Sequence, residues 1–236
     1  MVQTTKYRVM NKLDLEYQYL VRYILENGVE KKDRTLTGTK STFGWQIRHK
    51  MSDGFPLLTT KKVFWKGVVG ELLWFLRGDT NLKWLVDNGI GIWTGDAYKK
   101  YTEHFIGHED IPGQEWFEHE ITTNPEFAAK FGDLGPIYGR TWRNWGSMYE
   151  TNHILNTHTQ RKPGIDQIAN LIHDLKTNPD SRRLMVSAWN VGELDNMTLL
   201  PCHYGFQVYT RELSLEERTT LFENSKHSEH DNLVKF

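Results

Sequence analysis

The sequence predicts a mixed α+β fold with α/β layers, in which helices pack on a mixed β-sheet. Segments with helical periodicity are interspersed with short strand-like segments, without a regular strand-helix-strand succession. The chain has 236 residues, a length that fits one large domain. The helical segments are 13–28, 64–77 and 166–178, and the strand segments are 43–48, 184–189 and 204–210.

The predicted helices differ in how they should be covered. Residues 13–28 place apolar side chains on one face and stop at Gly28, as an amphipathic helix does. Residues 64–77 are apolar on nearly every side, so we expect this helix to be buried, with Glu71 in its middle. Asp166 caps the third helix, which Asn178 and Pro179 end.

The strands and the remaining segments follow from alternation and composition. Residues 43–48 alternate large apolar with smaller or polar side chains, as a half-buried strand does. Residues 94–131 and 147–163 are polar, aromatic and aperiodic, and we expect insertions or surface excursions there. Residues 211–236 form a polar tail for which we predict a loop or frayed end, either a disordered tail or part of an interrupted domain.

The overall charge excludes some classes of partner. Lys plus Arg number 29 and Asp plus Glu number 30, so the balance does not favour nucleic acid or an anionic membrane as a partner. One cysteine excludes an internal disulfide and fits a reducing compartment. The first residues lack a signal-like apolar run, and no segment has the ~20 apolar residues that span a bilayer. We therefore expect a soluble, cytoplasmic protein.

The single cysteine, Cys202, is the first candidate for chemistry. A thiol becomes a strong nucleophile as a thiolate, which nearby cations stabilise. Arg182 and Arg183 supply them if strand 184–189 runs beside the strand that Cys202 enters. A lone cysteine is, however, more often a small buried hydrophobe. The neighbouring His203 does not by itself form a catalytic pair, because successive strand residues point to opposite faces.

Glu71 is the second candidate, because a carboxylate inside a buried helix needs a hydrogen-bonding or charged partner, an ordered water or a functional role. One interpretation is general acid or base work. The other is a structural pair with a lysine or arginine on a narrow polar seam of the helix.

Two loops carry further chemistry. Residues 33–39 combine hydroxyls, a glycine and Arg34, which suits phosphate binding but is equally typical of an ordinary turn. Residues 132–140 are punctuated by glycines and form a rigid turn that presents Tyr138. The histidines and the cysteine have no metal-ligand spacing, so we expect no metal cofactor.

Taken in order, these segments resemble the thymidylate synthase family. The matching stretches are DRTLTGT (33–39), DGFPLLTTKK (53–62), GELLWFLRGDTN (70–81), IW (92–93), GDLGPIYGRTWR (132–143), DQI (166–168), NPDSRRLMVSAWNVGELDNM (178–197) and LPCHYGFQVY (200–209). The resemblance implies that residues 1–210 are the N-terminal part of the family's catalytic domain.

The resemblance also implies an activity, the reductive methylation of dUMP to dTMP. The thiolate of Cys202 would add to C6 of the pyrimidine, and 5,10-methylenetetrahydrofolate would give both the carbon and the hydride. Glu71 would organise water and protons around the pyrimidine O4, and Tyr138 would help to remove the C5 proton through water. His203 is counted with these catalytic residues.

Binding roles follow from the same resemblance. Arg34 would hold the phosphate of dUMP, and Arg182 with Arg183 would reach that phosphate from the other subunit of a homodimer. Trp93 would line the folate site. After Trp93 the family usually has an acidic residue and a second tryptophan, where this chain has Thr94 and Gly95.

The family continues beyond the last matching stretch with segments that bind phosphate, base and ribose. We find none of them between Tyr209 and Phe236, so we expect the chain to be C-terminally incomplete relative to the family and poorly stable by itself. Two alternatives stay open. One is a pyrimidine nucleotide hydroxymethylase, in which water rather than hydride ends the reaction, and the other is a non-catalytic remnant.

Overall fold

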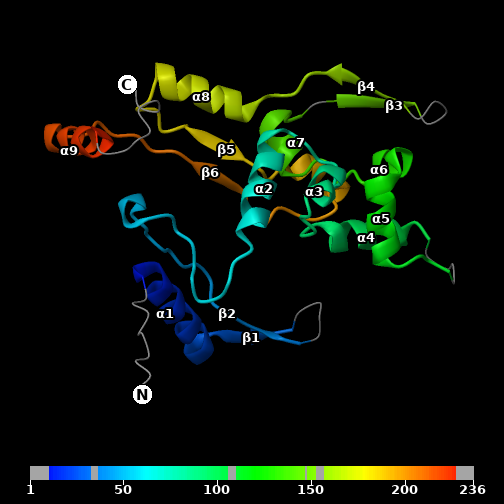
Figure 1. Ribbon diagram of the computed structural model, residues 1–236, viewed down its shortest axis with the longest axis horizontal. Helices are drawn as coiled ribbons and strands as arrows, with labels where there is room; N and C mark the ends of the chain where they lie inside the picture. Colours follow the sequence, from blue (N-terminus) through cyan, green and yellow to red (C-terminus); the bar gives the residue numbers. More distant parts are fainter. Residues whose placement is uncertain (1–10, 33–36, 106–109, 147, 153–156, 227–236) are drawn as a thin grey trace. The chain divides into compact units, whose positions relative to one another are not determined.

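The structure, a computed structural model, describes residues 11–32, 37–105, 110–146, 148–152 and 157–226 (Figure 1). The main chain divides into two compact units. The first ends at Trp65 and the second begins at Lys66. Each unit is described by itself.

The first unit begins with helix α1 (Lys12–Asn27). The Asn11 side chain accepts the N–H of Asp14 at 2.8 Å and so caps the helix start, and the helix ends at Gly28. The predicted helix over 13–28 is therefore confirmed. Strands β1 (Val29–Lys31) and β2 (Thr39–Ser41) pair antiparallel, and a short 3-10 helix η1 follows at Met51–Asp53.

The strand predicted over 43–48 is not present. These residues belong to no strand of the described chain. Trp45 instead packs on rings of α1, with its centroid 5.1 Å from Tyr23 and 5.9 Å from Tyr19, while Phe43 is fully exposed. Alternation produces a strand only where a partner strand completes the hydrogen bonds, and this unit provides none here.

The second unit contains most of the described elements. Its helices are α2 (Trp65–Leu76, whose first residue ends the first unit), α3 (Lys83–Asp87), α4 (Thr94–Glu103), α5 (Gln114–Thr123), α6 (Pro125–Phe131), α7 (Tyr138–Arg143), α8 (Gln167–Thr177), the 3-10 helix η2 (Val191–Asn196) and α9 (Leu215–Lys226). Its strands are β3 (Met148–Asn152), β4 (Thr157–Lys162), β5 (Met185–Ser187) and β6 (Gly205–Gln207). The described strands form separate antiparallel pairs. The presence of helices together with antiparallel strand pairs agrees with the predicted α+β class, and a single layered sheet stays a prediction.

Helix α2 forms where predicted, but it is covered on one side only. Trp74 and Phe75 are buried in the core, and Gly70 lets Ile90 approach closely, because a Cβ at Gly70 would lie 2.1 Å from the Ile90 side chain. Along the opposite side runs a stripe of exposed apolar residues, 36–49% accessible, made of Val68, Val69, Leu72 and Leu73. The expected all-round burial is wrong for the described chain, since its core reaches only one face of the helix.

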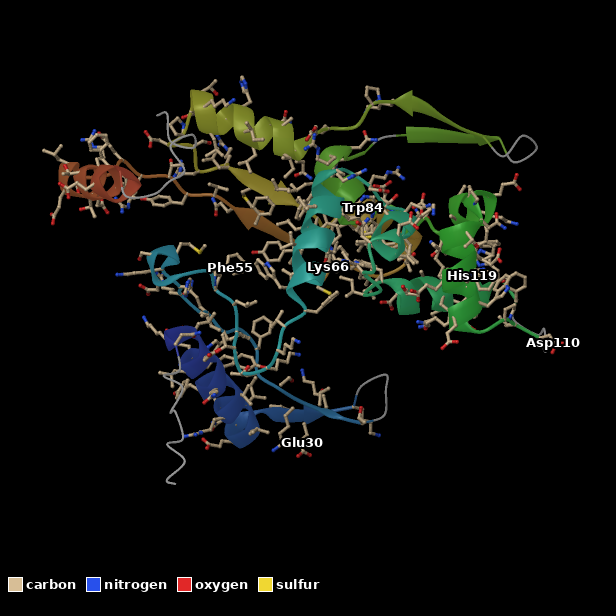
Figure 2. The ribbon with its side chains drawn as sticks, viewed as in Figure 1. Glu30, Phe55, Lys66, Trp84, Asp110 and His119 are labelled. Carbon is tan, nitrogen blue, oxygen red and sulfur yellow. The ribbon has the colours of Figure 1, made fainter. Side chains whose placement is uncertain are left out.

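The described residues of 94–131, which leave out 106–109, form a helical layer rather than a loose excursion. Helices α5 and α6 lie against each other, and α4 packs on α5 (Figure 1). Tyr101 is buried at the centre, with ring centroids 5.1 Å from Phe117 and 5.0 Å from Phe131. These rings form the core between three short helices. No single helix has an apolar stripe long enough to predict that core from the sequence. Arg77, which directly follows α2, places its guanidinium 5.1 Å from the ring centroid of Trp84 on α3, a residue labelled in Figure 2.

The second predicted excursion, 147–163, contains the hairpin of β3 and β4. After it, the Asp166 side chain caps α8 by accepting the N–H of Ala169 at 2.9 Å, and Arg143 pairs with the same carboxylate at 2.9 Å. The predicted helix over 166–178 is confirmed. The two last strands are also confirmed, shorter than expected, and β5 pairs with β6.

The polar tail holds a helix. Helix α9 begins with a reciprocal cap, in which Glu217 accepts the N–H of Ser214 at 2.8 Å and Ser214 accepts the N–H of Glu217 at 3.2 Å. Arg211 adds an ion pair, which holds the pKa of Glu217 down at about 2. The expected loop or frayed end is wrong for Leu215–Lys226, and residues 227–236 lie outside the described residues.

Within the described residues, no helix is both long and apolar enough to cross a bilayer.

Candidate active site

Glu71 and Trp93 meet in the core of the second unit. Glu71 lies on α2, and Trp93 directly precedes α4 and is 5% exposed. The indole N–H of Trp93 donates to Glu71 Oε1 at 2.7 Å. Burial raises the pKa of Glu71, and the hydrogen bond from Trp93 partly opposes this rise. A structural pair with lysine or arginine is therefore wrong for the described chain, because the partner is a neutral indole.

Tyr138 stands at the start of α7 and is 5% exposed. Its ring lies 4.5 Å from that of Phe75 and 6.4 Å from that of Trp93, so it shares one aromatic cluster with the Glu71 pair. Burial raises the pKa of Tyr138, while hydrogen bonds from the backbone of His203 and Cys202 lower it. The glycine-punctuated turn does present Tyr138, but inward.

Cys202 lies in a bend between buried Pro201 and β6, and its free thiol is exposed. The N–H of Cys202 donates to the Tyr138 hydroxyl at 2.5 Å, and the N–H of His203 points to the same oxygen at 3.4 Å. The alternative of a small buried cysteine is therefore wrong.

His203 covers the other side of Tyr138. The two rings stack with centroids 4.4 Å apart and planes 16° apart, and Trp142 lies 5.9 Å from the imidazole. Burial of this inner ring face lowers the pKa of His203. A lowered pKa favours the neutral form of this imidazole.

The predicted cations do not join Cys202 within the chain. Pairing of Met185 with Gln207 and of Ser187 with Gly205 places Arg182 and Arg183 beyond one end of the β5–β6 ribbon and Cys202 beyond the other. Both arginines are exposed, and the Arg182 carbonyl accepts from Gln207 at 2.9 Å. The strands run side by side as expected, but antiparallel pairing separates these residues.

Arg34 belongs to the loop predicted for phosphate, and it lies outside the described residues. Among the described residues, no group of three His, Cys, Asp or Glu side chains is arranged to hold a metal ion.

Several residues that hold this site were missed. Gln167 joins α7 to β5, since its Nε2 donates to the carbonyls of Thr141 and Ser187 at 2.7 and 2.8 Å, and its Oε1 accepts the N–H of Ser187 at 2.9 Å. Gly139 allows α7 to touch the Asp79 carbonyl, where a Cβ would lie 2.1 Å away. Both lie in stretches that match family motifs, which was the available signal.

Together these residues place three kinds of reactive group in one unit. The backbone N–H of an exposed cysteine bonds to a phenol oxygen, and that phenol shares an aromatic cluster with the indole that holds a half-buried carboxylate. Such a set suits nucleophilic addition combined with proton transfer.

Comparisons with known proteins identify relatives that match most of the chain. The thymidylate synthase family model matches residues 15–221. The thymidylate synthase of Mycoplasma genitalium is 45% identical over 203 residues, which is 85% of this chain and 64% of that protein. That of Mesoplasma florum is 47% identical over 195 residues, covering 82% and 61%, and that of Coxiella burnetii is 46% identical over 194 residues, covering 82% and 57%. The chain thus spans 57–64% of the length of these relatives. By the extent of these matches, the chain belongs to the thymidylate synthase family.

Proposed function

We propose that this chain acts in the reductive methylation of dUMP to dTMP, with 5,10-methylenetetrahydrofolate as co-substrate. The observation that carries the proposal is the bond from the Cys202 backbone to Tyr138, within the cluster that also contains Glu71 and Trp93. The nucleophile and two groups able to handle protons thereby belong to one compact unit.

Cys202 would start and end the reaction. Its thiolate adds to C6 of the pyrimidine, and the electron pair released at C5 attacks the one-carbon unit. The folate supplies that carbon and then a hydride, and so leaves as dihydrofolate. The C5 proton is lost and the Cys202 thiolate is expelled, which restores the pyrimidine double bond and the enzyme.

Glu71 and Tyr138 would move protons around the pyrimidine. A carboxyl whose pKa is raised by burial can both accept and release a proton closer to neutral pH, which suits exchange with water near O4. Tyr138 would assist removal of the C5 proton through water. His203, whose pKa burial lowers, would keep the phenol ring in place and accept a hydrogen bond from such a water.

Folate would bind near Trp93. The residues at this position fit a folate ring only in part. Trp93 itself offers little open surface, because its N–H is used by Glu71 and its ring is buried, whereas the neighbouring Ile92 is exposed and apolar. A pteridine ring would therefore find apolar contact at Ile92, over the site that Trp93 supports.

The phosphate of dUMP would be held by guanidinium groups. Arg34 is the candidate from the chain that carries the reacting cysteine, and Arg182 and Arg183 would come from the partner subunit of a homodimer. The separation of these arginines from Cys202 along the β5–β6 ribbon supports a role at a neighbour's site rather than at their own. A layered mixed sheet belongs to the same proposal, and a reducing compartment such as the cytoplasm would keep the thiol free.

One experiment tests the chemistry directly. The purified chain is incubated with 5-fluorodeoxyuridylate and methylenetetrahydrofolate, because the fluorine at C5 cannot leave as a proton and traps the covalent complex. Intact mass should show a ternary adduct that Cys202→Ser abolishes and Tyr98→Phe, a change elsewhere in the unit, does not. A folded chain without adduct would contradict the proposal. Turnover of deoxycytidylate without dihydrofolate formation would indicate a hydroxymethylase.

A second experiment tests the shared site. Cys202→Ser and the double variant Arg182→Ala/Arg183→Ala are each expected to form little adduct. Unfolded and refolded together, they should regain about a quarter of the adduct per subunit, because half of the dimers are mixed and each mixed dimer holds one site with an intact cysteine and intact partner arginines. No recovery from correctly refolded mixtures would place the arginines in their own subunit's site, and full adduct formation by the arginine double variant alone would place them outside any site.

A further inference from the structure

The oxygen of Tyr138 serves as an acceptor in this structure. The N–H of Cys202 reaches it at 2.5 Å, a short contact, and the N–H of His203 approaches it at 3.4 Å, which is long for a hydrogen bond. A phenol oxygen that receives a backbone N–H in this way can still donate its own proton to a third group. Holding the backbone and passing a proton are therefore separate tasks for the same side chain.

The Tyr138 ring is itself firmly placed. Phe75 and His203 lie close to it, at 4.5 and 4.4 Å between ring centroids. The helix that carries it lies directly against the Asp79 carbonyl at Gly139, where there is no room for a side chain. The hydroxyl oxygen is consequently a fixed point in the unit.

Backbone hydrogen bonds hold the segment that carries Cys202 at both of its ends. Upstream, the N–H of Thr198 donates to Leu134 at 2.9 Å, and downstream the Tyr204 carbonyl accepts from Ala188 at 2.7 Å. Between these two bonds Cys202 sits in an exposed bend. In the middle of this segment, Tyr138 accepts the backbone N–H of Cys202 and stacks on the ring of His203.

We propose that Tyr138 is a positioning residue for the nucleophile, because its hydroxyl oxygen holds the main chain of Cys202 and thereby fixes the direction of the thiol. The meaning of this anchor for catalysis rests on the proposed function, but the anchor itself does not. A residue that acted only as a proton relay would leave the Cys202 backbone unchanged when no substrate is present.

The single cysteine makes the anchor measurable. Protein grown with ¹⁵N-labelled cysteine has one labelled amide, that of Cys202, and gives a single amide resonance. In Tyr138→Phe the ring stays and the acceptor is lost, so this resonance should move upfield in the proton dimension. Its exchange with deuterium should become roughly two- to tenfold faster, the factor that corresponds to a net hydrogen bond of ~0.5–1.5 kcal/mol.

A matched control is Tyr98→Phe. Tyr98 belongs to the same unit, and its hydroxyl donates to the Pro112 carbonyl at 2.9 Å, far along the chain from Cys202. The same deletion of one oxygen there should leave the labelled resonance in place. If Tyr138→Phe does not fold, 3-fluorotyrosine at position 138 keeps the oxygen and weakens it as an acceptor, and a smaller upfield shift is expected.

A second readout is the alkylation rate of Cys202 by iodoacetamide, which reports only this thiol. Freed from its anchor, the thiol should react at a changed rate in Tyr138→Phe and at the original rate in Tyr98→Phe. An unmoved amide resonance with unchanged exchange in folded Tyr138→Phe would overturn the proposal. Since no readout needs substrate, a failure to form the fluorodeoxyuridylate adduct would overturn the proposed function and leave the anchor standing.

Discussion

Glu71 is held by a neutral partner. An indole N–H orients a carboxylate but brings no positive charge, so it offsets only part of the cost of burying Glu71. The folded chain therefore retains a proton on Glu71 to higher pH than the unfolded chain does. The resulting stabilisation is present below the ordinary glutamate pKa and is lost as the pH rises through the raised pKa.

Removing the donor should raise the Glu71 pKa further. In Trp93→Phe the Glu71 carboxylate loses the hydrogen bond that favours its charged form, so its ¹³C carboxyl titration should move to higher pH. The melting temperature of the variant protein should also fall more steeply between acidic and neutral pH than that of the original protein. Trp74→Phe is the control, because the Trp74 indole donates to the Asn81 carbonyl at 3.1 Å. Equal titration shifts in both variants would show that general loosening, not the hydrogen bond, sets the pKa.

Sequence reasoning at this scale found the residues but not their partners. A glutamate within an apolar helix indicates that a partner is needed but does not identify it. The partner, Trp93, lies 22 positions later in a segment without periodicity. Tyr138 and Cys202 are separated by 64 positions. Only the family resemblance linked such residues, because long-range pairing depends on how the elements pack rather than on local spacing.

Helices with their own start and stop signals were predictable, and the others were not. Asp166 caps α8 and Gly28 ends α1 as the sequence indicates, and each helix carries a regular apolar stripe. Helices α4 to α6 have short stripes whose aromatic rings contact each other, so no single segment shows the period. The Ser214 and Glu217 cap of α9 has the spacing of a capping box and was available as a signal within an otherwise polar stretch.

Two glycines in helices should respond in opposite ways to alanine. At Gly139 the added Cβ would lie 2.1 Å from the Asp79 carbonyl, so Gly139→Ala should destabilise the chain by ~1–3 kcal/mol. At Gly95 in α4 nothing lies within 4 Å of the added Cβ, so Gly95→Ala should stabilise by up to ~1 kcal/mol. Urea unfolding of both variants measures the difference. Equal midpoints would show that α7 can move away from Asp79.

At the scale of the whole molecule, the exposed stripe of α2 is the main liability. Val68, Val69, Leu72 and Leu73 occupy neighbouring positions on one helix face, and each is 36–49% exposed. An apolar stripe of this kind favours association with another apolar surface. The expected poor stability of the chain by itself has its physical basis here rather than in the buried face of the helix.

Leu72→Ser should therefore reduce self-association and the binding of the dye ANS. Leu72 is already about half buried, so complete coverage would add about half of the ~1.5–3 kcal/mol of a full leucine burial. The dimerisation constant in sedimentation should weaken about fivefold, the factor equivalent to ~1 kcal/mol. Leu215→Ser, at an exposed leucine of α9, is the matched control. Unchanged association in Leu72→Ser would exclude the stripe as the contact surface.

The aromatic cluster that supports Glu71 also has an optical consequence. The rings of Trp74 and Trp93 lie 6.0 Å apart with their planes at 58°, a geometry in which the two indole transitions interact. Their near-ultraviolet circular dichroism therefore depends on fixed packing, and it disappears when packing loosens even if the helices persist. The near-ultraviolet spectrum thus responds to the packing of the cluster that contains Trp93, the hydrogen-bond donor to Glu71.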